Sequence, residues 1–483
     1  MSITGALSNA LSGLTAASRS AEVIASNIAN VATEGYAART LTLSSRQGTM
    51  GGVRVDGVQR ELSPSLLAER RLADADQTQS QDLADALRRI EGLFGTPLDP
   101  ASLSAGTVAL ESALIEASSR PDLPERLQNV IAEANALTGK FRGISDGLQA
   151  IRTEADRSIA TQVDQLNSDL EAVQMFNQRI VSLQTQGGET ASLLDARQIA
   201  IDRINHIVPV MEVARSQGAV ALFTAGGAVL LDGRAVRIGF ERANVVAPQM
   251  TQSGGLLSGL TVNNVPVSTD HLRGPLQGGG LAAAFQVRDD LAPAVQQKLD
   301  GLARDLIERF GAPSVDPTLS PGQPGMFTDA SGPLDPATES GLAGRLSVNP
   351  ALDPAQGGRV SRLRDGLGTT TPAPPGDAAF LNRMIDGLAA RQQPSSGSLD
   401  PSALSFSELL SRSLSDIGGS RQWAEQRLSF AGTRAASLKA AELERGVDTD
   451  EQLQRLMMIE QAYSANARVI QAVDDMMQSL LRI

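Results

Sequence analysis

The chain has 483 residues, more than the ~250 to 300 at which one hydrophobic core stops growing, so we expect at least two domains. Its 42 basic and 54 acidic residues give a net charge of -12, which disfavours binding to nucleic acid and to anionic membranes. The lack of cysteine excludes disulfides, thiolate metal sites and cysteine nucleophiles.

The first thirty residues carry an unbroken heptad pattern. Apolar side chains recur at alternating steps of four and three, at Ile3, Leu7, Ala10, Leu14, Ala17, Ala21, Ile24, Ile28 and Val31. This spacing predicts a coiled-coil helix roughly 45 Å long. The same stretch lacks a basic segment followed by a compact apolar core, so we expect no cleaved secretory signal. The chain also has no run of ~18 apolar residues that would span a membrane.

Helical periodicity dominates the next part of the chain. Ser63 and Pro64 begin a helix that extends to residue 94. Residues 123–183 keep steps of three and four throughout, which predicts a helix of roughly 85 Å if it is continuous. The segment "QTQGGET" predicts a turn, after which residues 193–207 return antiparallel. We therefore expect an elongated helical bundle.

The pattern changes at residue 208. Residues 208–285 contain short β-favouring runs separated by glycine-rich turns, which predict a small β-rich domain. A helix follows at 287–310, and residues 311–402 then hold 13 of the 23 prolines, which favours loops and a few strands without a core of their own. Residues 406–444 are helical again, with a predicted break at Gly418 and Gly419, and Trp423 is expected to pack inside the bundle.

The C-terminus repeats the design of the N-terminus. Gly446 ends the preceding helix, and Asp448 with Glu451 predicts a capping box. A second seam follows, formed by Leu456, Ile459, Tyr463, Asn466, Ile470, Val473, Met477 and Leu480. Asn466 is either a solvated residue or a core amide that fixes helix register. Both seams are weak, because the first has three alanines and the second has Asn466, so each helix keeps apolar surface for further neighbours.

These elements predict a mainly α fold with a small β-rich middle domain, in which terminal coiled-coil helices and an elongated helical bundle follow a nested order. Residues 1–35 with 448–483 form the predicted terminal assembly domain. Residues 36–207 with 286–447 form the helical bundle, including the Pro/Gly-rich loops at 311–402, and residues 208–285 form the β-rich outer domain.

One motif resembles catalytic chemistry. Residues 143–147 fit G-x-S-x-G, so a secreted serine hydrolase using Ser145 is the alternative from another functional class. That chemistry needs a strand-to-helix turn and a histidine base, whereas Ser145 lies inside a helical pattern and His206 and His271 are the only histidines. Neither histidine belongs to an acidic cluster with metal-ligand spacing. We expect no catalytic site, cofactor or metal.

The end of the first helix carries a recognisable motif. The stretch "SNIANVATEGY" resembles a signature of the bacterial flagellar axial proteins, which include rod, hook and hook-associated subunits. The matching positions are Asn27, Ile28, Ala29, Asn30, Thr33, Gly35 and Tyr36. The segments "LRRIEGLFGTP" and "LLDARQIAIDRINHIVPV", together with the C-terminal helix, are similar to the hook-associated branch of this family. The resemblance covers about 1–210 and 405–483.

This resemblance implies a structural, non-enzymatic subunit that polymerises through its terminal helices, forms the hook-filament junction, and is needed for filament assembly and motility. A hook or distal-rod subunit is the nearest alternative, although those proteins lack the long helical span at 123–206. The implied partners are copies of the chain itself, the hook protein, the next hook-associated junction protein and a flagellar export chaperone. The implied location is the extracellular flagellum, reached by type III export without a cleaved signal peptide.

The predicted assembly interface consists of the two seams and the turn that follows the first helix. Its members are Ile3, Leu7, Leu14, Ile24, Asn27, Ile28, Asn30, Gly35, Tyr36, Leu456, Ile459, Tyr463, Asn466, Ile470, Val473, Met477 and Leu480. Two such narrow apolar stripes bury little surface when they meet alone, so we expect both ends to be disordered before assembly.

Overall fold

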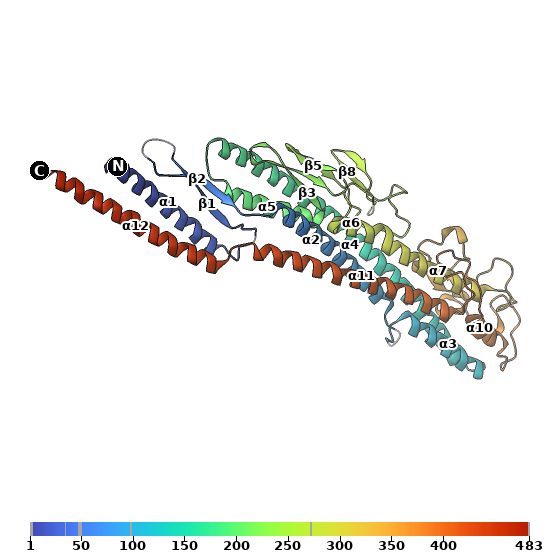
Figure 1. Ribbon diagram of the computed structural model, residues 1–483. Helices are drawn as coiled ribbons and strands as arrows, with labels where there is room; N and C mark the ends of the chain where they lie inside the picture. The colour runs from blue at the N-terminus through green and yellow to red at the C-terminus, as the bar shows by residue number, and fades with distance from the viewer. Residues whose placement is uncertain (1–2, 34, 47–50, 97–98, 271–272, 482–483) are drawn as a thin grey trace.

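The computed structural model describes residues 3–33, 35–46, 51–96, 99–270 and 273–481, and most of them are helical (Figure 1). The α-helices are α1 (Ile3–Ala29), α2 (Pro64–Phe94), α3 (Leu103–Ser119), α4 (Pro124–Thr185), α5 (Ala191–Ile207), α6 (Gly279–Gln286), α7 (Ala292–Gly311), α8 (Leu342–Arg345), α9 (Arg362–Asp365), α10 (Ala379–Ala389), α11 (Phe406–Glu444) and α12 (Thr449–Leu481). The prediction of a mainly α fold with small β-rich parts is confirmed.

The strands form small antiparallel sheets. They are β1 (Arg39–Ser45), β2 (Val53–Arg60), β3 (Val210–Ala214), β4 (Val220–Thr224), β5 (Val229–Asp232), β6 (Arg234–Ala235), β7 (Ile238–Gly239), β8 (Leu260–Val262), β9 (Val265–Val267), β10 (Phe327–Asp329) and β11 (Leu346–Val348). The strand orders are β1-β2, β3-β4-β5-β6, β7-β8-β9 and β10-β11. Short 3-10 turns lie at Ser216–Gly218, Pro336–Thr338, Pro350–Leu352 and Pro354–Gln356.

The molecule is elongated, and its two ends differ (Figure 1). The terminal helices α1 and α12 lie side by side and antiparallel at one end, where both chain termini are found. Helices α2, α4 and α11 run along the body, and α3 and α10 lie at the opposite end. The terminal helices are therefore the part of the molecule farthest from α3 and α10.

The long helix α4 forms the backbone of the body. It is continuous from Pro124 to Thr185, as the periodicity predicts, and Pro124 occupies its first turn, where a missing N–H costs nothing. Gly147 allows close packing against α2, because a Cβ at this position would lie 2.6 Å from Leu93 Cδ2.

The two halves of α4 belong to two different hydrophobic cores. The first half of α4 packs with the end of α2, with α3, and with residues from the proline-rich segment, among them Phe327 and Leu346. The second half packs with α5, α6 and the sheets of residues 210–267. The proline-rich segment therefore joins an existing core, as expected, although its helix α10 was not predicted.

Three details of the sequence interpretation need correction. Helix α11 does not break at Gly418 and Gly419, since it packs along α2 and this packing offsets the ~1 kcal/mol helix penalty of each glycine. Trp423 is exposed instead of packing inside the bundle. Helix α1 ends at Ala29, so Val31, the last residue of the predicted seam, lies outside the helix and is exposed. The hairpin β1-β2 and helix α3 were not predicted.

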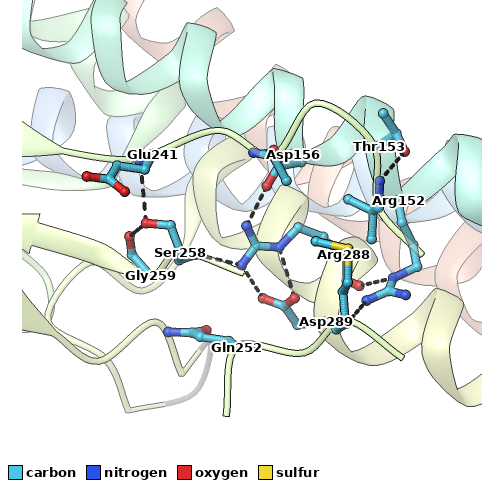
Figure 2. Close-up of polar contacts among 12 residues, drawn as sticks. Arg152, Thr153, Asp156, Glu241, Gln252, Ser258, Gly259, Arg288 and Asp289 are labelled. Carbon is cyan, nitrogen blue, oxygen red and sulfur yellow. Dashed lines mark hydrogen bonds and ion pairs between the residues drawn. The ribbon is translucent and has the colours of Figure 1, made fainter. Parts of the chain in front are cut away.

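A buried arginine joins the two cores at the point where α6 meets α7 (Figure 2). Arg288 lies in the π-helical turn Val287–Leu291 and is fully buried. Its Nη1 donates to Asp156 Oδ1 at 2.7 Å, and its Nη2 donates to Asp289 Oδ2 at 2.8 Å and to the Ser258 carbonyl at 3.0 Å. Its guanidinium carbon lies 4.8 Å from the centre of the Phe285 ring. Its Nε donates to Asp289 Oδ1 at 2.9 Å, so each donor nitrogen of Arg288 has an acceptor.

Arg152, one turn before Asp156 on α4, extends this cluster (Figure 2). It donates to the Arg288 carbonyl at 2.9 Å and to the Ala247 and Met250 carbonyls at 3.0 and 2.6 Å. Burial lowers the pKa of Arg152 from its ordinary value. The cluster thus fastens the segment that contains Ala247 and Met250 onto α4.

A buried carboxylate holds the first turn of α8. Asp300 on α7 accepts hydrogen bonds from the backbone N–H groups of Gly341 at 2.7 Å and Ala343 at 2.9 Å, and from Gln296 Nε2 at 2.9 Å. Burial raises the pKa of Asp300 to about 6 from an ordinary 3.8. The folded chain therefore binds this proton more tightly than the unfolded chain does.

We predict a pH dependence of stability from Asp300. The free energy of unfolding falls as pH rises from about 4 to about 6, with a total contribution of roughly 3 kcal/mol from this carboxyl. Urea unfolding between pH 4.5 and 7 should show this slope in the wild type, and Asp300→Asn should reduce it, whatever the variant's absolute stability. Asp232→Asn, at an exposed position, should keep the wild-type slope. An unchanged slope in Asp300→Asn would contradict the assignment.

Candidate assembly interface of the terminal helices

The α1–α12 pair is held by a narrow stripe of small and aliphatic side chains. Ala10, Ala17 and Ile24 of α1 and Val473 of α12 are buried. Eight other predicted seam residues are half-buried: Ile3, Leu14, Ala21, Ile28, Leu456, Ile459, Asn466 and Ile470. The structure therefore brings the two predicted seams together, over a limited buried surface.

The remaining predicted seam residues stay uncovered. Leu7 on α1, and Tyr463, Met477 and Leu480 on α12, are exposed. Further exposed apolar residues that the seam pattern left out lie on the same helices: Leu11, Leu453, Met457, Met458, Val469 and Met476. An isolated pair of helices thus presents apolar side chains along both partners, which is typical of a surface that binds another chain.

Asn466 lies inside the pair, opposite a glycine of α1. A Cβ on Gly13 would lie 2.8 Å from both amide atoms of Asn466, so Gly13 leaves the space that this side chain occupies. Asn466 is half-buried, and its Nδ2 donates to the Ala462 carbonyl of its own helix at 2.9 Å. Its position at the helix contact favours the interpretation that it fixes register, through shape complementarity with Gly13.

Asn27 forms four hydrogen bonds that join α1 to the segments packed against it. It is fully buried, and its Nδ2 donates to the Arg39 carbonyl at 2.8 Å and to Gln452 Oε1 at 3.0 Å. Its Oδ1 accepts from the Tyr36 hydroxyl at 2.8 Å and from the Arg39 N–H at 3.0 Å. One amide therefore links α1, the Gly-Tyr turn, the first residue of β1 and the first turns of α12.

The rest of the motif builds the turn between α1 and β1. Asn30 Nδ2 donates to the Ser26 carbonyl at 2.9 Å, and the Thr33 hydroxyl donates to Asn30 Oδ1 at 3.1 Å. The guanidinium of Arg39 lies 4.6 Å from the centre of the Tyr36 ring. Asn30, Gly35 and Tyr36 are half-buried, so the motif acts as a structured helix stop.

Gly35 is predicted to be irreplaceable in this turn. Its φ is +73°, and a Cβ would lie 2.6 Å from Ile199 Cγ1 on α5. Gly35→Ala therefore adds a clash to the roughly 1–2 kcal/mol cost of left-handed backbone, and we expect it to reduce swimming in soft agar. Gly233→Ala is the matched control, since Gly233 has a φ of +76° and no atom within 4 Å of its Cβ position. Equal effects of both variants would contradict this account.

The carboxylate of Asp195 connects the β1-β2 hairpin to α5 in the body. Asp195 on α5 accepts from Arg39 Nη2 at 2.5 Å and pairs with Arg60 Nη2 at 2.7 Å, so it holds both strands of the β1-β2 hairpin. Burial lowers the pKa of Arg60, while the attraction of Asp195 opposes this change. The role of Asp195 was not predicted from the sequence, because its partners Arg39 and Arg60 belong to a hairpin that was itself not predicted.

A second polar cluster lies where α2, α5 and α11 approach one another. Arg70 pairs with Asp202 at 2.8 Å and with Glu442, near the end of α11, at 2.8 Å. The adjacent Arg71 pairs with the other oxygen of Asp202 at 2.7 Å and with Glu212 of β3 at 3.0 Å. Ion pairs thus hold both chain segments that lead from the body to the terminal helices.

Comparisons with known proteins match both the helical body and the terminal helices. The model of the flagellar hook-associated protein FlgK helical domain matches residues 87–314. The models of the flagella basal body rod protein and of the flagellar basal body rod FlgEFG protein C-terminal match residues 7–36 and 444–483. Flagellar hook-associated protein 1 of Escherichia coli (strain K12) is 24% identical, over 99% of this chain and 99% of that protein. The chain is therefore similar to flagellar hook-associated protein 1 over nearly its full length.

A second curated protein and a solved structure are also similar to the chain. Flagellar hook-associated protein 1 of Bacillus subtilis (strain 168) is 22% identical, over 98% of this chain and 97% of that protein. The solved flagellar hook junction protein FlgK from Burkholderia pseudomallei superposes with a TM-score of 0.44 and 18% identity, over 55% of this chain and 46% of that one. The sequence matches show that the chain is a structural protein of the bacterial flagellum and not an enzyme.

The surroundings of Ser145 do not fit the catalytic serine of a hydrolase. This serine lies in the interior of α4, is buried, and donates to Gln296 Oε1 at 3.2 Å, so it has neither a strand-to-helix turn nor a histidine partner. His206 contacts the Thr78 hydroxyl at 3.0 Å, and His271 is outside the described residues. Within the described ranges, no cluster of three metal-ligating side chains occurs. Those ranges also contain no helix of the length and apolar character needed to span a membrane.

Proposed function

We propose that this chain is a subunit of the hook-filament junction that polymerises through α1 and α12 and is required for filament growth and motility. The similarity to flagellar hook-associated protein 1 supports the location, and the exposed apolar residues of the paired terminal helices support the mode of assembly. The single observation that carries the mode of assembly is this pairing of α1 with α12, which leaves apolar side chains of both helices uncovered.

The narrow contact between α1 and α12 favours polymerisation. Burial of apolar surface contributes roughly 25 cal/mol per Å², so covering the exposed leucines and methionines with neighbouring copies adds stability that the lone pair lacks. The two helices present different surfaces, and contacts between unlike surfaces close into rings or continue as helical tubes. The terminal helices become stably ordered in the assembled layer and are disordered in the free chain.

The proposed partners follow from the position of a junction. They are further copies of the chain, the hook protein, the next hook-associated junction protein, and an export chaperone that binds the C-terminal helix before assembly. The chain reaches the outside of the cell by type III export without cleavage. Residues 1–35 with 448–483 act as the assembly domain, and the helical bundle and the β-rich residues 208–285 form the outer parts.

The proposed function can be tested by substituting a buried residue of the α1–α12 contact and observing whether filaments form. Val473→Asp puts a charge into the buried α1–α12 contact, and we expect cells that carry this variant as their only copy to have hooks without filaments. Val245→Asp is the matched control, because Val245 is exposed on the body, and its cells should have normal filaments. Electron microscopy of both strains decides the question. Normal filaments on Val473→Asp cells would contradict the proposed function.

A further inference from the structure

Helix α11 carries an exposed stripe of aromatic and basic side chains. The α11 stripe consists of Trp423, Arg427, Phe430 and Arg434, at steps of four, three and four, which place them on one face. Trp423 is 63% exposed and Phe430 is 73% exposed. Residues 426–441 contain three cations and no carboxylate, in a chain whose net charge is -12. This combination of exposed aromatics and arginine is typical of interface residues.

The packing of α11 leaves all four residues of this stripe exposed. The buried residues of the same part of the helix, Ala424, Ala431 and Ala435, lie on a different face from the stripe. Arg427 Nη2 lies 3.1 Å from Asp76 on α2, and its guanidinium carbon lies 5.8 Å from the Trp423 ring centre. Arg434 forms no ion pair with any residue that the structure describes. The guanidinium of Arg434 is therefore available to pair with an acidic side chain of another molecule.

Helix α3 presents a stripe of the opposite charge. The α3 stripe consists of Val108, Glu111 and Ile115, at steps of three and four. Val108 is 59% exposed and Ile115 is 51% exposed, while the opposite face of the helix, including Leu110 and Leu114, is fully buried in the first core. Residues 103–119 contain two glutamates and no cation. This helix therefore offers aliphatic side chains beside an acidic group.

We propose that the α11 stripe of one copy binds the α3 stripe of a second copy. The charges are complementary, and the aromatic side chains of α11 match the aliphatic side chains of α3, so the contact buries apolar surface and pairs Arg434 with Glu111. Because the two stripes are different surfaces, the contact is heterologous and repeats around a ring or along a helix. This inference rests on the proposed function and adds a contact between the bodies of neighbouring subunits.

Disulfide crosslinking tests this contact directly, because the natural chain has no cysteine. A chain with Phe430→Cys and Ile115→Cys is expressed as the only copy, and isolated flagella are oxidised. We expect a ladder of crosslinked copies on non-reducing gels, because each copy can bond to the next. The matched control pairs Ile115→Cys with Val245→Cys, where Val245 is 72% exposed on the body, and it should give no ladder.

Four outcomes would overturn the proposal. The first is a lack of crosslinks in flagella that contain the chain, which leaves the proposed function intact. The second is a dimer formed by Phe430→Cys alone, which would show that α11 meets α11. The third is the absence of the wild-type chain from isolated flagella, which would overturn the proposed function as well. A photoactivatable maleimide on Phe430→Cys should label α3 of a second copy, and label on another flagellar protein would also overturn the proposal.

A charge exchange gives an independent readout. Arg434→Glu or Glu111→Arg alone places like charges opposite each other, and we expect each to reduce the crosslink yield at least several-fold. The double exchange restores the opposite charges and should return the yield towards that of the parent pair. Failure of the double exchange to improve on both single variants would contradict the pairing of Arg434 with Glu111.

Discussion

Asn27→Ala is expected to abolish filament assembly. The variant removes the amide that joins α1 to the Gly-Tyr turn, β1 and Gln452 of α12, and so leaves several buried polar groups without partners. Each such group costs roughly 1–3 kcal/mol, so a total of about 3 kcal/mol would weaken subunit association about 100-fold. Cells with this variant as their only copy should have hooks without filaments and should not swim.

The matched control for Asn27 lies three residues further along the chain. Asn30 belongs to the same motif, but its bonds to Ser26 and Thr33 stay within the turn and lie nearer to solvent. We expect Asn30→Ala to reduce the swimming radius without abolishing filaments. If Asn27→Ala cells swim as well as Asn30→Ala cells, the buried amide is not the residue that joins the two terminal helices.

Arg288→Met should cause the largest loss of stability in the body. It leaves Asp156 as a buried carboxylate without its cation, and breaking a buried ion pair typically costs roughly 3–5 kcal/mol. The site lies where the two cores meet, so both should be affected (Figure 2). Urea unfolding of the purified chain, followed by circular dichroism, should show a much lower midpoint for the variant.

A surface pair provides the control for this loss. Arg89 on α2 pairs with Glu154 on α4, and both side chains are about half exposed. Arg89→Met should cost no more than about 1 kcal/mol, because exposed ion pairs contribute little. A comparable loss in the two variants would mean that the buried cluster does not hold the cores together.

The sequence predicted the long elements best, because a helical period that persists over many turns outweighs local exceptions. Helix α4 and the two terminal helices were found in this way, and the motif at Asn27 identified the turn. Tertiary packing explains the misses: Gly418 lies in a continuous helix because α11 packs along α2. The β1-β2 hairpin was not predicted, because its strands lie between two long helices whose periodicity dominates this part of the sequence.

The long-range ion pairs could not be predicted from the sequence for another reason. Asp195 and Arg60 are 135 positions apart, and nothing in the spacing of charges says which of the many arginines meets which carboxylate. The same holds for Asp156 and Arg288. Pairing of this kind follows from the fold, so the site was predicted as two apolar seams and a turn, without the ion pairs that hold it to the body.

Hydrogen exchange on the free chain in dilute solution is the most direct test of the central claim that the terminal helices become stable only through assembly. We expect fast exchange in peptides from α1 and α12, and strong protection in peptides from α4 and α5, whose buried faces belong to the two cores. Protection of α1 and α12 equal to that of α4 in the monomer would contradict the account.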